Sequence, residues 1–220
     1  MQTSGNKETD LHLAVSVRSF RCEKIASFVQ SLLENQPEQA KVVFSSIKNN
    51  YPIFLTRNIN TAKQWLKQTA KGTERIGIVA SSGGRRLRAE GIDVKNEIDP
   101  ANWFLNDKDD VRSSYYLEEI ATEFDIQGLE IDFTCVAWDI NLHHDGKEWN
   151  YQNFKGSKWQ NINQDATKNY LLNSYRVLLT RARQGMIIFI PNVDNSDKTR
   201  PKAFYDQTFE YLQRCGLSEI

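Results

Sequence analysis

Four short apolar segments constrain the fold of this chain more than any other feature. They are four to six residues long and lie at Ile53–Thr56, Ile76–Ala80, Phe133–Trp138 and Met186–Ile190. Runs of this length are too short for helices and are typical of strands buried on both faces. Because amphipathic segments lie between them, they predict an α/β fold with a mainly parallel sheet flanked by helices.

Apolar residues at helical spacing lie between and beyond these strands. Five recur at three- and four-residue intervals before Pro37, namely Ile25, Phe28, Val29, Leu32 and Leu33. Further helices are expected at about residues 61–70, 165–183 and 202–216. The first of these joins two buried segments, which predicts that Ile53–Thr56 and Ile76–Ala80 are neighbouring parallel strands.

Two regions differ from this pattern. Residues 1–10 are polar, and we expect them to be disordered, with a strand at Leu11–Val17 opening a single domain over residues 11–220. Residues 139–164 are polar and aromatic, with turn signals at Asp145-Gly146 and Lys155-Gly156. This region is predicted to be a β-hairpin insertion.

Charge and cysteine content limit the classes of function. Lys+Arg and Asp+Glu are equal at 28 each, so a large phosphate-binding surface is not expected and any nucleic-acid contact must be local. The three cysteines are widely spaced, which favours a reduced, cytoplasmic setting. The longest apolar runs are too short for a signal peptide or a membrane span.

The segment Tyr175–Arg183 contains the first candidate site residue. Arg181 is predicted to lie at the end of a helix, at the edge of its apolar stripe and just before a buried strand. An arginine placed there can reach into a cleft at the rim of a sheet. Its planar guanidinium supplies two directed donors for charge that develops on a transferring phosphoryl group. On residue type alone, a solvated helix flank is the commoner interpretation.

Two further segments are candidates for the same kind of site. Gln127, Gly128 and Glu130 come directly before a buried strand, where a glycine permits close approach of the backbone and a carboxylate can accept from a sugar hydroxyl. Arg18 lies between the expected first strand and first helix, where a helix N-terminus and a basic side chain can share an anion. Taken singly, an acidic loop and a surface arginine are the simpler explanations.

The order and spacing of these segments resemble the second motor domain of superfamily 1 helicases. Arg18-Ser19 is similar to an early Tyr-Arg-Ser segment, with Val17 where tyrosine is usual. Gln127–Asp132 resembles a Lys/Gln-Gly-Leu-Glu-Phe/Ile-Asp segment before a strand, and Leu179–Ala182 resembles a Leu-Thr-Arg-Ala segment that ends a helix. More narrowly, residues 121–130 and 175–191 resemble the Schlafen-like group 3 helicase family.

This resemblance implies a RecA-like fold and a role for each matching residue. Arg181 is expected to be the arginine finger on the γ-phosphate of ATP, bound with Mg²⁺, and Arg18 a second γ-phosphate contact. Gln127, Gly128 and Glu130 are expected to line the nucleotide cleft. Thr122 is expected to touch a phosphate of single-stranded DNA or RNA.

The 220-residue sequence contains no recognisable phosphate-binding loop. No GxxxxGK[ST] segment is present, and Ser82-Gly-Gly-Arg-Arg86 lacks both the spacing and the Lys-Ser/Thr pair. The expected partner is therefore an amino-terminal P-loop RecA-like domain, from the same polypeptide or a separate one. Without it, these residues are predicted to hydrolyse no ATP.

Alternatives remain for the chain as a whole and for particular residues. Glu130 and Asp132 lie on one side of an extended segment, as a Mg²⁺-dependent nuclease would need, and a non-catalytic interaction module is a third possibility. Arg85 and Arg86 are equally compatible with a phosphate-backbone patch and a solvated loop. For His143 and His144, turn residues are favoured over metal ligands because no third ligand motif accompanies them. Four aromatic residues are expected to pack the hairpin onto the domain rather than to stack on bases: Trp149, Tyr151, Phe154 and Trp159.

Overall fold

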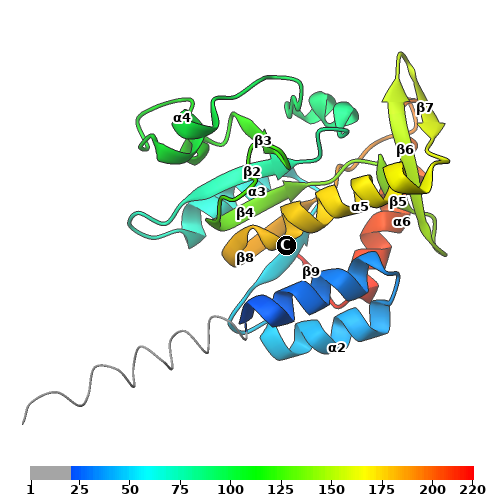
Figure 1. Ribbon diagram of the computed structural model, residues 1–220, viewed down its shortest axis with the longest axis horizontal. Coiled ribbons are helices and arrows are strands. Elements are labelled where there is room, and N and C mark those ends of the chain that lie inside the picture. Colours follow the sequence, from blue (N-terminus) through cyan, green and yellow to red (C-terminus); the bar gives the residue numbers. More distant parts are fainter. Residues whose placement is uncertain (1–20) are drawn as a thin grey trace, which may run out of the picture.

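A six-stranded sheet forms the centre of the computed structural model, which describes residues 21–220 (Figure 1). All of its pairings are parallel, and the strand order is β3-β2-β4-β8-β1-β9. The predicted α/β class with a mainly parallel sheet is confirmed. The strands are β1 (Ile53–Thr56), β2 (Ile76–Ala80), β3 (Ile120–Thr122), β4 (Ile131–Ala137), β8 (Ala182–Phe189) and β9 (Ser218–Glu219).

The expectation that β1 and β2 are neighbours is wrong. The strands β4 and β8 lie between them, and β4 pairs with β2 on one side and with β8 on the other. The connecting helix α3 (Ile59–Thr69) is long enough to cross this gap, and it contacts all four of these strands. A helical crossover determines that two strands are parallel but not how many strands lie between them.

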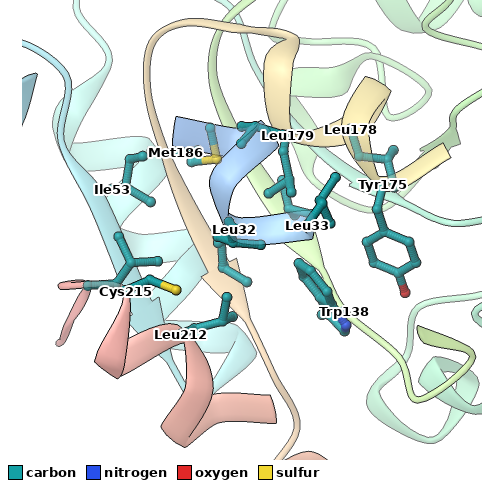
Figure 2. Close-up of a cluster of buried hydrophobic side chains, with 14 of the residues drawn as sticks. Leu32, Leu33, Ile53, Trp138, Tyr175, Leu178, Leu179, Met186, Leu212 and Cys215 are labelled. Carbon is teal, nitrogen blue, oxygen red and sulfur yellow. The ribbon is translucent and has the colours of Figure 1, made fainter. Parts of the chain in front are cut away.

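Helices cover the two faces of the sheet unequally. The helical residues 21–33, α2 (Pro37–Ile47), α5 (Asp165–Thr180) and α6 (Lys202–Arg214) cover one face, where they form the larger core (Figure 1). Figure 2 shows Leu32 and Leu33 of the first helix packed beside Leu178 and Leu179 of α5 and Met186 of β8. The opposite face is covered by α3 and the shorter helix η1 (Arg85–Glu90), with Tyr115 of η2 (Ser114–Tyr116) packed beside them. The short helix α4 (Pro100–Leu105) instead buries Trp103 in the larger core.

The predicted insertion is a three-stranded antiparallel sheet that extends from the carboxyl end of β4. It consists of β5 (Leu142–His144), β6 (Trp149–Lys155) and β7 (Lys158–Asn161). Trp149 is buried and stacks on Trp138, with ring centroids 5.6 Å apart, and Trp159 donates from Nε1 to the carbonyl of Thr199 at 2.8 Å. These contacts fix the hairpin to the domain, as expected for its aromatic residues.

The interpretation of His143 and His144 as turn residues is wrong. Both lie on β5 and are buried, and their rings stack on Phe204 and Tyr211 with centroids 4.0 Å apart in each pair. The turn comes after them, where Gly146 takes a φ of 90°. A histidine without its charge is a flat, partly apolar ring, so it can serve as a core residue.

The boundary between α5 and β8 also differs from the prediction, which continued the helix to Arg183. Helix α5 ends at Thr180, Arg181 is its C-cap, and β8 begins at once with Ala182. The strand begins this early because Ala182 pairs with Ile131 at the start of β4. The strand expected at Leu11–Val17 and the polar residues 1–10 lie outside the described residues. Among the helices of residues 21–220, none is long and apolar enough to cross a membrane.

Candidate functional site

Arg181 lies where α5 ends and β8 begins, at the amino end of the strands. Its backbone remains in the right-handed helical region, with φ −86° and ψ −20°, so the side chain leaves from the last turn of the helix. Its Nε is buried and has no hydrogen-bond partner, and the guanidinium pairs with no acidic side chain within residues 21–220. A half-buried cation without a protein anion is available for an anionic ligand.

A cavity of about 180 Å³, which we call the arginine cavity, opens beside Arg181. Glu130 lines the same cavity, together with Thr180, Arg183 and the start of the helix at residues 21–33. The N–H of Ile131 donates to the carbonyl of Arg181 at 3.1 Å, which holds the segment before β4 against the end of α5. The structure thus brings together two of the residues predicted from separate motifs.

Arg21 also lines this cavity and was not singled out from the sequence. It belongs to the segment Val17–Arg21 that contains the predicted Arg18, so the signal was the basic character of the whole segment. Arg18 itself lies outside the described residues. With Arg21, Arg181 and Arg183 around one small cavity and Glu130 as its acidic residue, the site has an excess of positive charge.

Arg183 is held by an ion pair at the edge of this cavity. Its Nη2 lies 2.7 Å from Oδ1 of Asp132, a carboxylate that is 6% exposed. Burial by itself raises the pKa of Asp132, but hydrogen bonds from Gln184 Nε2, the Arg75 N–H and Arg183 outweigh it and hold the pKa below its usual range. Asp132 is therefore an ionised anchor that orients Arg183.

The nuclease alternative requires Asp132 to be available for a metal ion. Its two carboxylate oxygens instead accept from Arg75, Arg183 and Gln184. Within residues 21–220, no group of three or more His, Cys, Asp and Glu side chains is placed to hold a metal ion. The geometry of Glu130 and Asp132 therefore does not favour a nuclease site.

Gln127 and Gly128 lie in a turn that leads to Glu130. Gly128 takes a φ of 84°, a left-handed conformation that favours glycine, and a Cβ added there would meet no atom within 4 Å. A side chain would therefore fit in the space at this position, and it is the left-handed backbone conformation that favours glycine here. Gln127 is exposed, and the turn carries the chain from the end of β3 toward the cavity.

The predicted nucleic-acid residues lie at the other edge of the sheet. Thr122 ends β3 level with Ala80, and Ala80 is level with Ala137 at the end of β4. The cavity lies at the start of β4, six residues earlier, so the two edges are about 20 Å apart at 3.3 Å per residue. Thr122 Oγ1 donates to Asp125 at 2.7 Å, which caps the turn that follows.

Arg85 and Arg86 have different surroundings at this edge. The guanidinium of Arg86 pairs with Asp197 at 2.7 Å and lies 5.4 Å from the ring centre of Phe154, so its charge is already used within the protein. The side chain of Arg85 is exposed, and among the described residues its guanidinium donates only to the carbonyl of Phe154. Of the two, Arg85 is the better placed to meet a phosphate from solution.

Comparison with known families identifies the chain. The family model described as Schlafen group 3, DNA/RNA helicase domain matches residues 1–192. The chain belongs to this family. No curated protein and no solved structure matches it. The Schlafen group 3 assignment confirms the resemblance seen in the motifs, and the matched range includes Arg181, Glu130 and Thr122.

A larger cavity in this Schlafen group 3 domain contains none of the predicted residues. It has a volume of about 500 Å³ and lies between the end of α3 and residues 108–116, with Lys67, Glu74 and Tyr115 in its wall. Size alone therefore does not select the functional site. The smaller cavity is the candidate because two of the predicted segments meet in it and because Arg181 pairs with no acidic side chain in the described part of the chain.

Proposed function

We propose that this Schlafen group 3 domain is the second motor half of an ATP-dependent DNA or RNA helicase or translocase. Its cavity at the amino ends of β4 and β8 meets an ATP site whose phosphate loop and Mg²⁺ ligands come from a P-loop domain, in the same polypeptide or in a partner chain. The observation that carries this proposal is the meeting of Arg181 and Glu130, from two separate motifs, in one cavity where Arg181 pairs with no acidic side chain of residues 21–220.

The residues of the cavity suit the outer side of a bound nucleotide. Mg²⁺-ATP supplies the γ-phosphoryl group and a ribose with free hydroxyls. Arg181 donates to γ-phosphate oxygens as negative charge shifts in the transition state, and its position on the last turn of α5 limits its motion. Arg21 adds positive charge, Arg183 is held at the edge of the cavity by Asp132, and Glu130 accepts from a hydroxyl.

Two elements connect this cavity to the opposite edge of the sheet. The segment from Thr122 to Glu130 leads from the end of β3 to the cavity, and α5 runs from the side of the antiparallel hairpin to the start of β8 (Figure 1). Closure of the cavity on nucleotide would therefore shift both elements together. Thr122 and Arg85, at the far edge, contact the phosphates of a single strand and receive this motion.

The proposal is tested by ATP hydrolysis in the protein that joins this domain to its P-loop domain. Arg181→Ala should lower the turnover of ATP by about 10³-fold or more, since arginine fingers contribute on this scale. Arg112→Ala is the matched control, because Arg112 is an exposed arginine paired with Asp110 that lies outside both motifs and outside the cavity wall. It should leave turnover unchanged.

Two results would contradict the proposal. One is an unchanged rate for Arg181→Ala, which would favour a non-catalytic interaction module. The other is magnesium-dependent turnover by the 220-residue chain alone, which contains no GxxxxGK[ST] segment. In the second case the activity must be lost with Arg181→Ala, to exclude a contaminating ATPase.

A further inference from the structure

Two exposed aromatic rings lie against each other on the surface, away from the cavity that contains Arg181. Phe124, in the turn after β3, is 57% exposed, and Tyr170, on α5, is 53% exposed. Their ring centroids are 6.3 Å apart and their planes are tilted by 33°. Among the ring pairs formed by residues 21–220, this is the one made by two exposed side chains.

The position of the pair relates it to the cavity through both connecting elements. Tyr170 is eleven residues before Arg181, so the two lie within about 20° of the same face of the helix and about 16 Å apart along it. Phe124 lies in the same segment as Glu130, six residues earlier. The aromatic pair and the arginine cavity are thus at opposite ends of the same two elements.

We propose that Phe124 and Tyr170 form a stacking platform for a base of single-stranded nucleic acid. The proposal rests on the proposed function for the link between this platform and the ATP site. It rests on membership of a DNA/RNA helicase domain family for the choice of nucleic acid as the ligand. Every base has a π-face, so a platform of this kind holds a strand without reading its sequence. Two exposed rings in water leave apolar surface that a base would cover.

Two carboxylates flank Phe124 in the sequence, and both are held by hydrogen bonds within the protein. The carboxylate of Glu123 accepts from the N–H and the hydroxyl of Ser82, both at 2.8 Å. The carboxylate of Asp125 accepts from the N–H and the hydroxyl of Thr122, both at 2.7 Å. Exposed amides lie close by in sequence, at Gln127 in the same turn and at Asn173 one helical turn beyond Tyr170, and can bond to base edges or sugars.

The test measures binding of fluorescein-labelled oligothymidylate to the 220-residue chain at low ionic strength, beside an abasic oligonucleotide of equal length. The abasic strand keeps the phosphates and sugars but has no base to stack. Phe124→Ala and Tyr170→Ala should each raise the Kd for oligothymidylate about tenfold or more, in the range known for base–aromatic stacking. Neither should change the Kd for the abasic strand.

Controls separate stacking from damage to the fold. Tyr170→Phe should bind like the wild type, because it keeps the ring. Tyr116→Ala should also bind like the wild type, because Tyr116 is an exposed tyrosine, 44% accessible, in the wall of the other cavity. Both alanine variants should unfold at wild-type denaturant concentrations, since the rings that they remove are more than half exposed.

Three results would overturn the platform: no binding of oligothymidylate by the wild type, no loss in either alanine variant, or an equal loss on the abasic strand. None of them decides whether Arg181 acts on ATP. Conversely, an unchanged ATPase rate in Arg181→Ala with a tenfold binding loss in Tyr170→Ala would refute the motor role and leave the platform standing.

Discussion

Arg181 and Glu130 line one cavity although they belong to different motifs far apart in the chain. The contact is built into the backbone, because the residue after Glu130 donates its N–H to the carbonyl of Arg181 at 3.1 Å. The parallel pairing of β4 with β8 continues from this point. The ends of two motifs therefore meet because two strands begin side by side.

Asp132→Ala should lower the free energy of unfolding by about 2–3 kcal/mol, because it leaves Arg183, Gln184 and the N–H of Arg75 without their shared acceptor. Chemical denaturation measures the loss. Asp109→Ala is the control, since Asp109 is exposed and forms no ion pair among the described residues. An equal effect of the two substitutions would show that Asp132 does not anchor the segment.

Arg86→Ala and Arg85→Ala should act on different properties. Arg86→Ala removes an ion pair with Asp197 and a contact with the ring of Phe154, and should cost about 1 kcal/mol of stability. Arg85→Ala should leave stability within about 0.5 kcal/mol of the wild type, because Arg85 is exposed. It should weaken binding of single strands and reduce the dependence of that binding on salt, as loss of a phosphate contact does. Wild-type affinity and salt dependence in Arg85→Ala would remove Arg85 from the nucleic-acid surface.

Gly128→Ala should destabilise the domain by about 1–2 kcal/mol, because alanine at a φ of 84° is strained although there is space for its Cβ. Gly128→Asn should cost less, since asparagine tolerates this region better than alanine. Gln127→Ala, at the neighbouring exposed position, should be nearly neutral for stability. If alanine at 128 proved neutral in thermal unfolding, the left-handed turn would be refuted.

His144 should remain neutral far below the usual pKa of histidine. Burial first, and then the nearby charge of Arg214, lower its pKa from 6.5 to about 4. The N–H of Gly146 donates to its Nδ1 at 3.0 Å, so Nε2 carries the proton and donates to Asn35 at 2.9 Å. Titration of the imidazole by NMR should show this pKa, and a value near 6.5 would contradict the buried, stacked ring.

The same shift makes stability depend on pH. Between pH 6.5 and about 4 the unfolded chain binds a proton at His144 and the folded domain does not, so acid favours unfolding in this window. Stability should therefore be full above pH 6.5 and fall by about 2 kcal/mol or more as the pH drops to 4. In His144→Phe, which keeps a ring against Tyr211, this share of the pH dependence should disappear.

The sequence by itself determined the long buried strands, the main amphipathic helices and which residues are candidates for chemistry. Buried strands at Ile53–Thr56 and Ile76–Ala80 follow from short apolar runs, and the helical residues 21–33 from apolar spacing, because these patterns reflect local geometry. Arg181 and Glu130 were chosen as candidates from short motifs in the same way. Local patterns carry this information because burial depends on period and length.

Only the tertiary structure decided which of these segments lie side by side. The insertion of β4 and β8 between β1 and β2, the burial of His143 and His144 against α6, and the entry of Arg21 into the cavity all depend on contacts between residues distant in sequence. So does the separation of Thr122 and Arg85 from the arginine cavity by the length of the sheet. Strand order and side-chain partners are set by packing of the whole core, and no local pattern of residues contains them.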